Sequence, residues 1–189
     1  MKKLLLAALA ASAAFASPAM AQTVTGTVTI TGSVANKCLV LPGSGSTFGT
    51  TVALGELAQA DGTMRTNLAA SFNAAAGLTA RVVCTTANPT IAIDSTALAT
   101  VAPAAAGYDN SIDFQADVAV TTINSTTTYS NDSAAVPLAA TALDGRLANN
   151  GSSNIAITAS NFRTGALTDL LVASPTYTGQ ILITIAPGA

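Results

Sequence analysis

The chain has 189 residues, with seven basic and nine acidic side chains and neither His nor Trp. Charged residues make up 8% of the chain, against roughly 25% in ordinary globular proteins. Without clustered Lys and Arg a nucleic-acid partner is excluded, and without His a Ser/His/Asp or Cys/His nucleophile cannot be built. We therefore expect no enzyme and no nucleic-acid binder, although an apolar content of 50% is enough for a packed core.

Residues 1–21 have the pattern of a secretory signal peptide. Two lysines precede the apolar stretch Leu4–Ala16, and Ala19-Met20-Ala21 supplies the small residues that a signal peptidase reads. This apolar stretch is too short to span a bilayer, and no later one approaches about 20 residues, so we expect export without membrane insertion. Cleavage before Gln22 leaves one domain's length of chain.

The next segment, Thr23–Val34, alternates strictly between apolar or Gly residues and Thr or Ser, which predicts a long strand. At about 3.3 Å per residue it reaches about 40 Å. It begins two residues after the predicted cleavage site, so it either closes its own sheet or adds to the edge of another molecule. Its apolar face consists of Val24, Gly26, Val28, Ile30, Gly32 and Val34.

The two cysteines, Cys38 and Cys84, both follow the predicted signal peptide. In an exported chain an even pair most simply forms one disulfide, and two buried free thiols are the alternative. A loop of this length would stabilise the fold by about 4 kcal/mol on the chain-entropy model. Two cysteines without His do not make a standard zinc site.

Later segments show the same strand periodicity. Several short strands separated by turn-forming residues predict an all-β sandwich. The expected strands are Leu78–Thr85, Thr90–Asp94, Ile112–Val120, Asn154–Thr158 and Tyr177–Ala186. The expected loops are Leu41–Gly49, Ala102–Asn110, Ile123–Ser133 and Asn149–Ser153, and Asn73–Gly77 is expected to form at most a helical turn.

The acidic residues offer little chemistry. Asp109, Asp113 and Asp117 are the nearest to a cluster, and residues 109–113 are similar to the opening of a calcium loop. The Gly and the bidentate Glu of such a loop are absent. We expect Asp113 and Asp117 to share the solvent face of a strand, and we expect no metal and no cofactor.

Four places resemble the subunits of chaperone–usher pili, above all their archaic branch and the related spore-coat-U-like domain. The order and spacing of these places carry the resemblance, because no single one is specific. They are Val34-Ala35-Asn36-Lys37-Cys38 after the alternating strand, Thr47-Phe48-Gly49, the segment Arg81–Thr85 around the second cysteine, and the closing strand Tyr177–Ile185.

The resemblance implies an immunoglobulin-like sandwich (residues 37–189) that lacks its last strand and therefore has a groove along an unpaired edge. It implies that residues 22–36 are a donor strand, whose knobs are Val24, Val28, Ile30 and Val34, with Gly26 and Gly32 where backbones approach closely. Its partners would be identical or related pilin subunits, a periplasmic chaperone and an outer-membrane usher. The product would be a cell-surface fibre of a Gram-negative bacterium that serves adhesion and biofilm formation.

The alternative is a self-contained exported β-sandwich that acts as a surface or carbohydrate-binding module. Such modules usually bind through exposed aromatic side chains. The absence of Trp and the presence of only three Tyr give this alternative little support.

Overall fold

The computed structural model describes residues 25–41, 48–74 and 78–188. The chain divides into two units, Met1–Ser33 and Val34–Ala189. The predicted signal peptide and Val24 lie outside the described residues. In the first unit, residues 25–33 form neither a strand nor a helix, so the strand predicted for Thr23–Val34 is not formed by the described part of this segment within the single chain.

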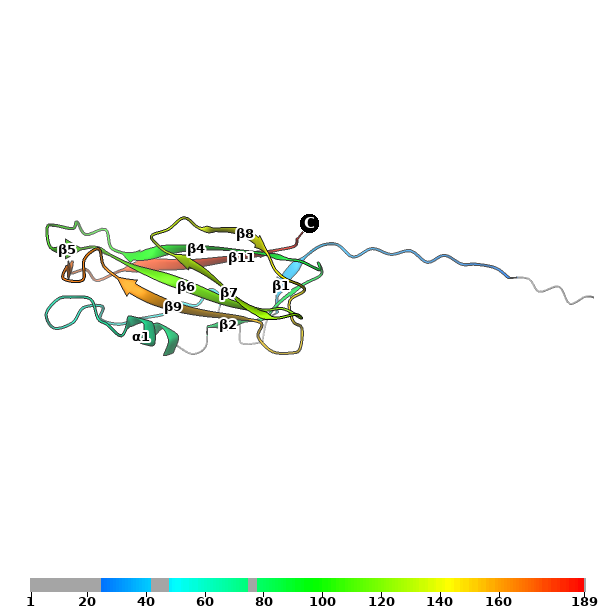
Figure 1. Cartoon of the computed structure of the whole chain (residues 1–189), viewed down its shortest axis with the longest axis horizontal. Coiled ribbons are helices and arrows are strands. Elements are labelled where there is room, and N and C mark those ends of the chain that lie inside the picture. Colours follow the sequence, from blue (N-terminus) through cyan, green and yellow to red (C-terminus); the bar gives the residue numbers. More distant parts are fainter. Residues whose placement is uncertain (1–24, 42–47, 75–77, 189) are drawn as a thin grey trace, which may run out of the picture. The chain divides into compact units, whose positions relative to one another are not determined.

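Among the described residues of the second unit, all regular elements but one short helix are β-strands (Figure 1), which confirms the all-β prediction. Among the described residues, no helix is long and apolar enough to cross a membrane. The elements are β1 (Cys38–Val40), α1 (Leu68–Ala74), β2 (Thr79–Ala80), β3 (Val82–Cys84), β4 (Thr90–Ala99), β5 (Tyr108–Asp109), β6 (Ser111–Thr121), β7 (Thr126–Asp132), β8 (Leu138–Ala142), β9 (Ile155–Arg163), β10 (Leu170–Leu171) and β11 (Thr178–Ala186).

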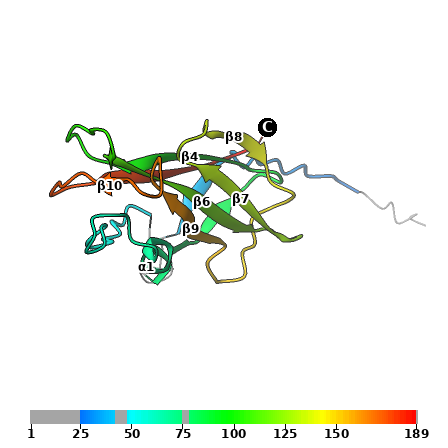
Figure 2. The same ribbon diagram turned by 60° about the vertical axis from the view of Figure 1, so that its left-hand side comes forward.

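The strands form two layers packed as a sandwich (Figures 1 and 2). In one layer β4 pairs with β11 on one side and with β8 on the other. In the second layer β6 lies between β7 and β9, and β9 also pairs with β2. The layers join where the end of β4 pairs with the start of β6. Two short ladders, β1–β3 and β5–β10, complete the fold. The immunoglobulin-like connectivity implied by the resemblance stays a prediction.

The core consists of the apolar face of β6 and the apolar side chains of other segments that pack against it. The alternation predicted for Ile112–Val120 is confirmed, because each apolar residue on that face is buried. The larger cluster packs Val118 and Val120 against Ile91 and Ile93 of β4 and Ile155 of β9. A smaller cluster surrounds Phe114, which stacks on Phe162 with 5.5 Å between ring centroids.

The predicted strand Leu78–Thr85 is split in two at Arg81. The first half, β2, pairs with β9, whereas the second half, β3, pairs with β1. Two more strands, β4 and β9, extend beyond the ranges predicted for them, because their backbone pairing with β11 and β6 continues to Ala99 and Arg163. The only helix of the described residues, α1, begins at Leu68, five residues before the predicted helical turn, and residues 75–77 of that turn lie outside the description.

The predicted loop Ile123–Ser133 is wrong, because most of it forms β7. This strand pairs with β6 from Thr126 to Asp132. Its Thr and Ser side chains are largely exposed, so the sequence lacks the apolar alternation that marks a half-buried strand. Its buried Asn131 accepts a hydrogen bond from the Ser95 amide (2.8 Å) and donates one to the Val136 carbonyl (2.9 Å).

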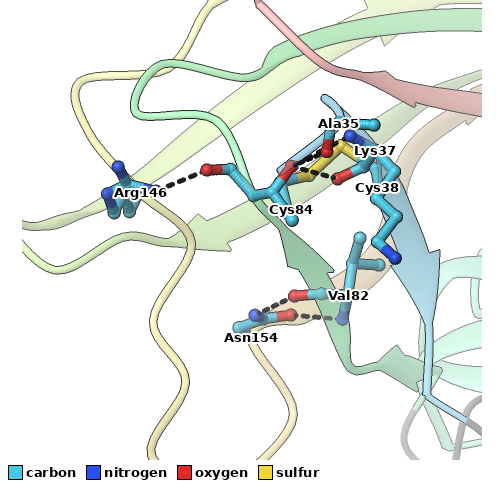
Figure 3. The surroundings of a disulfide bond; sticks show 8 residues. Ala35, Lys37, Cys38, Val82, Cys84, Arg146 and Asn154 are labelled. Atoms are coloured by element: carbon cyan, nitrogen blue, oxygen red, sulfur yellow. Dashed lines mark hydrogen bonds between the residues drawn. A yellow bond between two sulfur atoms is a disulfide. The ribbon is translucent and has the colours of Figure 1, made fainter. Parts of the chain in front are cut away.

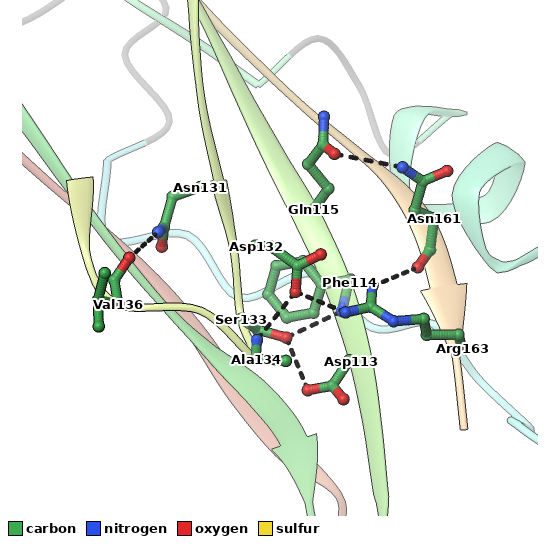
Figure 4. Close-up of polar contacts among 10 residues, drawn as sticks. All are labelled: Asp113, Phe114, Gln115, Asn131, Asp132, Ser133, Ala134, Val136, Asn161 and Arg163. Atoms are coloured by element: carbon green, nitrogen blue, oxygen red, sulfur yellow. Dashed lines mark hydrogen bonds and ion pairs between the residues drawn. The ribbon is translucent and has the colours of Figure 1, made fainter. Parts of the chain in front are cut away.

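Polar contacts continue at the end of β7 (Figure 4). Asp132 forms an ion pair with Arg163 of β9 at 2.7 Å, and this hydrogen bond, helped by the Ala134 amide, lowers the pKa of the Asp132 carboxyl. The Ser133 hydroxyl accepts from the Phe114 amide and donates to Asp113. Because Asp132 and Arg163 are partly exposed, their ion pair positions the strand end more than it stabilises the fold.

The side chain of Asn154 links three segments of the fold, and Figure 3 shows its two hydrogen bonds to Val82. It is buried, accepts a hydrogen bond from the Val82 amide (2.9 Å), and donates to the carbonyls of Val82 (2.7 Å) and Ala148 (2.8 Å). A buried amide that bonds both backbone groups of Val82 holds the start of β3 beside the start of β9.

Replacing Asn154 with Ala should lower the free energy of unfolding by about 2–4 kcal/mol, because buried backbone groups lose their partners. Urea denaturation, read as a shift of the midpoint, checks this. The matched control is Asn150→Ala at an exposed position, with an expected change within about 0.5 kcal/mol. Equal effects of the two substitutions would contradict the role given to Asn154.

Candidate functional site

The outer edge of β11 has no partner strand among the described residues. β11 pairs with β4 on one side only and stands at the end of its sheet. Its inward-facing residues Ile181, Ile183 and Ile185 are packed against the core cluster but stay partly exposed. An unpaired strand edge beside incompletely covered apolar side chains is a template for another strand.

Across from this edge lies β1, a strand of three residues whose only partner strand among the described residues is β3. Cys38 and Cys84 stand directly opposite each other in this ladder and form a disulfide, as predicted (Figure 3). No free cysteine is present. Following the pairings through β3, β2, β9, β6 and β4 shows that β1 and β11 run in opposite directions. The disulfide therefore holds β1 in place opposite the outer edge of β11.

Hydrogen bonds of Thr85, from both its backbone and its hydroxyl, hold the chain beyond the disulfide. The Thr85 hydroxyl accepts a hydrogen bond from the Lys37 amide (3.0 Å) and donates one to the Ala35 carbonyl (3.0 Å). The Thr85 amide donates to the Lys37 carbonyl (2.9 Å), and Arg146 donates to the Thr85 carbonyl (2.7 Å). Residues 35–37 are thus held in line with β1.

Two adjoining open cavities lie along β11 and form what we call the groove. The larger, about 530 Å³, lies between β11 and residues 48–54, and the smaller, about 270 Å³, lies between β11 and β1. Phe48 and Ile183 line both, so they mark the boundary between the cavities. Together the cavities accompany β11 from Thr178 to Ile185.

The larger cavity has an aromatic and aliphatic lining. Phe114 and Phe162 reach it from β6 and β9, and Phe72 reaches it from α1, with ring centroids of Phe72 and Phe162 6.5 Å apart. At the far end, the Tyr177 hydroxyl donates a hydrogen bond to the Val172 carbonyl (2.8 Å). Burial, with the nearby charge of Asp109, raises the pKa of Tyr177, so the phenol stays neutral and keeps this bond. The remaining aliphatic lining is supplied by Val52, Leu54, Leu78, Leu98, Ile157, Ile181 and Ile183.

The predicted donor residues that the structure describes are exposed. The exposed fractions are 86% for Val28, 91% for Ile30 and 77% for Val34. Gly26 and Gly32 have open space around them within this chain. Three exposed aliphatic side chains on one face of a segment are a candidate contact surface. Whether they occupy a neighbour's groove stays a prediction.

The three aspartates singled out in the sequence have separate surroundings. Asp109 accepts hydrogen bonds from the amides of Ser111 and Gly165, Asp113 accepts from Ser133, and Asp117 accepts from Gln115, Ser130 and Ser160. Within the described residues, no three His, Cys, Asp or Glu side chains gather where they could hold a metal ion. These three carboxylates therefore accept hydrogen bonds from amides and side chains of the neighbouring strands and turns.

Several groove residues have no local signal in the sequence. The sequence marks Phe48 only through the resemblance, and it gives no signal for Leu39, Val40 and Phe72. Each lies in a stretch too short for periodicity, and their meeting depends on pairings between distant strands. The apolar face of β11 is the one part of the groove that alternation alone indicates.

Comparison with known proteins returned no matching family model, no matching curated protein and no matching solved structure. We therefore infer function from the groove and from the exposed segment.

We expect thiol labelling of the non-reduced protein to find no reactive cysteine, and labelling after reduction in denaturant to find two. Replacing Cys38 and Cys84 together with Ala should lower the free energy of unfolding by about 4 kcal/mol, because the unfolded chain regains the entropy of an open loop. Denaturant titration measures this loss. Two reactive thiols in the non-reduced protein would contradict the disulfide.

Proposed function

We propose that this protein is a structural subunit of an extracellular fibre, and that residues 22–36 of each subunit fill the groove of the next. The observation that carries the proposal is an open apolar groove between two strand edges that have no partner strand among the described residues, in a chain that also presents an exposed segment with an alternating apolar pattern. The groove lacks one strand, and a second copy of the chain can supply it.

The donor segment and the groove along β11 have matching lengths. β11 has nine residues, which extend over about 30 Å at about 3.3 Å per residue. Residues 26–34 are also nine, and in extended conformation they cover the same distance. A strand laid along β11 would complete the ladder through its backbone while its side chains alternate between groove and solvent.

The chemistry of the two faces matches as well. The apolar face of the segment would enter a groove lined by Ile181, Ile183 and aromatic rings, and the Thr and Ser face would stay in water. Burying each of Val28, Ile30 and Val34 contributes about 1.5–3 kcal/mol before the costs of association. This gain rests on apolar contact, which suits a chain with few charges.

The direction of insertion follows from the two ends of the groove. Residues 35–37 lead out of the domain at the Cys38 end, beside Ile183–Ile185, and Tyr177 lies at the opposite end. A strand antiparallel to β11 brings its own domain to the Tyr177 end, away from the acceptor's own exit. Head-to-tail contacts of this kind do not close, so they give an open filament.

The exposed groove is the reason to expect accessory proteins, namely a chaperone and an usher. Before assembly a subunit has an unpaired edge and an apolar groove in water, which is a hazard for aggregation. A periplasmic chaperone that lends a strand would protect it, and an outer-membrane usher would exchange that strand for the next subunit's segment. In this proposal the protein is exported and serves adhesion or biofilm formation as part of a pilus with immunoglobulin-like subunits.

Replacing Ile30 with Asp should abolish fibres while the subunit stays folded. In the fibre Ile30 is desolvated by the neighbour, and an unpaired carboxylate there costs several kcal/mol; in the subunit it is exposed. Electron microscopy and size-exclusion chromatography measure assembly. The control, Thr29→Asp, puts the same charge on the solvent face and should still assemble. Loss of the folded subunit in Ile30→Asp would instead place this segment in the subunit's own core, as in a self-contained surface module.

A chain that lacks residues 22–34 should aggregate, and a peptide spanning Thr23–Val34 should bind it and keep it monomeric, because the peptide covers the groove. Light scattering and fluorescence anisotropy of a labelled peptide measure the two effects. The same peptide with Asp in place of Ile30 is the control and should not bind. A truncated chain that is a stable monomer and ignores the peptide would contradict strand donation.

A further inference from the structure

Three places in the chain have a glycine directly after an aspartate or an asparagine. They are Asp61-Gly62, Asp144-Gly145 and Asn150-Gly151. At such a pair the backbone nitrogen of the glycine can attack the side-chain carbonyl carbon of the preceding residue and close a succinimide ring. Glycine favours this attack because it has no Cβ in the way of the ring. The sequence alone makes all three pairs reactive, and the structure separates them.

In the pair Asp61-Gly62 both reacting groups are held by hydrogen bonds. The Gly62 nitrogen donates to the Gln59 carbonyl (3.0 Å), and the Gly62 carbonyl accepts from the Leu171 amide (2.9 Å). The Asp61 carboxylate accepts from the hydroxyl and the amide of Thr63, and these bonds lower the pKa of Asp61. An ionised carboxylate is a poor electrophile, so we expect this pair to be protected in the folded protein.

The pair Asp144-Gly145 is restrained in a similar way. The Asp144 carboxylate accepts hydrogen bonds from the hydroxyls of Ser125 (2.5 Å) and Thr122 (2.6 Å), and these bonds lower the pKa of Asp144. Gly145 is buried, and a Cβ there would lie 2.7 Å from the side-chain nitrogen of Asn124. Ring closure turns the backbone at the glycine, and the contact with Asn124 opposes this turn.

The pair Asn150-Gly151 has none of these restraints. Both residues are exposed, and no atom lies within 4 Å of the place that a Cβ on Gly151 would take. In the part of the chain that the structure describes, residues 149–152 make no hydrogen bond between main-chain groups, so the Gly151 nitrogen is not held by another strand or turn. The side-chain oxygen of Asn150 accepts from the Ser152 amide (3.2 Å), which polarises the carbonyl that would be attacked.

The sheet fixes the chain on both sides of this exposed loop. Before the loop the Ala148 amide donates to the Thr121 carbonyl (3.0 Å), and after it the Asn154 amide donates to the Ala80 carbonyl (3.0 Å). A covalent change between these two bonds is confined to exposed residues. The strands on either side need not move when the ring closes.

We infer that Asn150 is a site of spontaneous deamidation in the folded protein. Hydroxide takes the proton of the Gly151 amide, the nitrogen forms a bond to Cγ of Asn150, and the Cγ–Nδ2 bond breaks. Nδ2 takes up a proton and leaves as ammonia. Water then adds to one of the two ring carbonyls and breaks its bond to the ring nitrogen, which gives an aspartyl or an isoaspartyl residue. One water is consumed for each ammonia released, and nothing is oxidised or reduced.

The product has a negative charge beside an arginine. The side chain of Asn149, one residue before the reacting amide, accepts a hydrogen bond from Arg81. Within the described residues Arg81 forms no ion pair, and its buried Nε has no hydrogen-bond partner. The new carboxylate therefore appears near a positive charge that lacks a counter-ion. The reaction needs only the folded subunit and water, so it occurs whether or not the protein forms fibres.

One tryptic peptide carries the test. Cleavage after Arg146 and Arg163 releases residues 147–163, which contain Asn150 and three asparagines that serve as internal controls, namely Asn149, Asn154 and Asn161. The folded, non-reduced protein is incubated at mildly alkaline pH and digested, with a sample at time zero as the reference. Mass spectrometry with fragmentation locates each replacement of NH2 by OH. We expect this change at Asn150, at a rate at least tenfold above that at each control.

Two variants and the free peptide complete the experiment. Gly151→Ala should slow the change at Asn150 at least tenfold, because a Cβ hinders the attacking nitrogen. Asn150→Gln keeps the amide but requires a larger ring, and it should show no change at this position. The isolated peptide 147–163 gives the rate without the fold. A folded protein that reacts more than tenfold more slowly than this peptide, or equally at the control asparagines, would overturn the inference.

The protection of the other two pairs is measured in the same digests. Isoaspartate should form at Asp61 and Asp144 at least tenfold more slowly in the folded protein than in the chain unfolded by urea, because the hydrogen bonds of their carboxylates are lost on unfolding. Equal rates in the folded and the unfolded chain would contradict the selection of Asn150 by the structure.

Discussion

The unpaired outer edge of β11 is the constraint on which the rest of the structure depends. A strand in the middle of a sheet has hydrogen-bond partners on both sides, whereas β11 has only β4 as a partner strand within the described part of the chain. Its isoleucines point toward the core but are only partly covered. The neighbouring parts border this edge without closing it: β1 is tied back to β3 by the disulfide, and residues 48–54 line the larger cavity.

Local alternation predicted the strands whose two faces meet different environments. β6 and β11 alternate between apolar and polar residues because one face is turned to the core, and both were predicted nearly to their ends. β7 and β8 escaped prediction because most of their side chains are exposed, so backbone pairing with β6 and β4 holds them without an apolar pattern. Apolar periodicity in the sequence indicates which face of a strand is buried, but it does not indicate with which strand that strand pairs.

The groove was predictable only in outline. The apolar face of β11 and the cysteine pair could be read from the sequence, but Phe48 and Tyr177 are 129 positions apart and meet one cavity through several ladders. β1 has three residues, too few for any period, and its place follows from the Cys38–Cys84 bond. Contacts between such distant residues depend on how the strands of the two layers pair, and a short stretch of sequence carries no information about this pairing.

The location of the disulfide has a mechanical consequence for a fibre built as proposed. Tension along such a fibre would enter each subunit through residues 35–37 and reach Cys38 first. The covalent bond passes the load directly to Cys84 in β3, so the three-residue strand β1 cannot be peeled away one hydrogen bond at a time. Under load in such a fibre, β1 would thus stay attached to β3, and the force would act next on the non-covalent contacts beyond this bond.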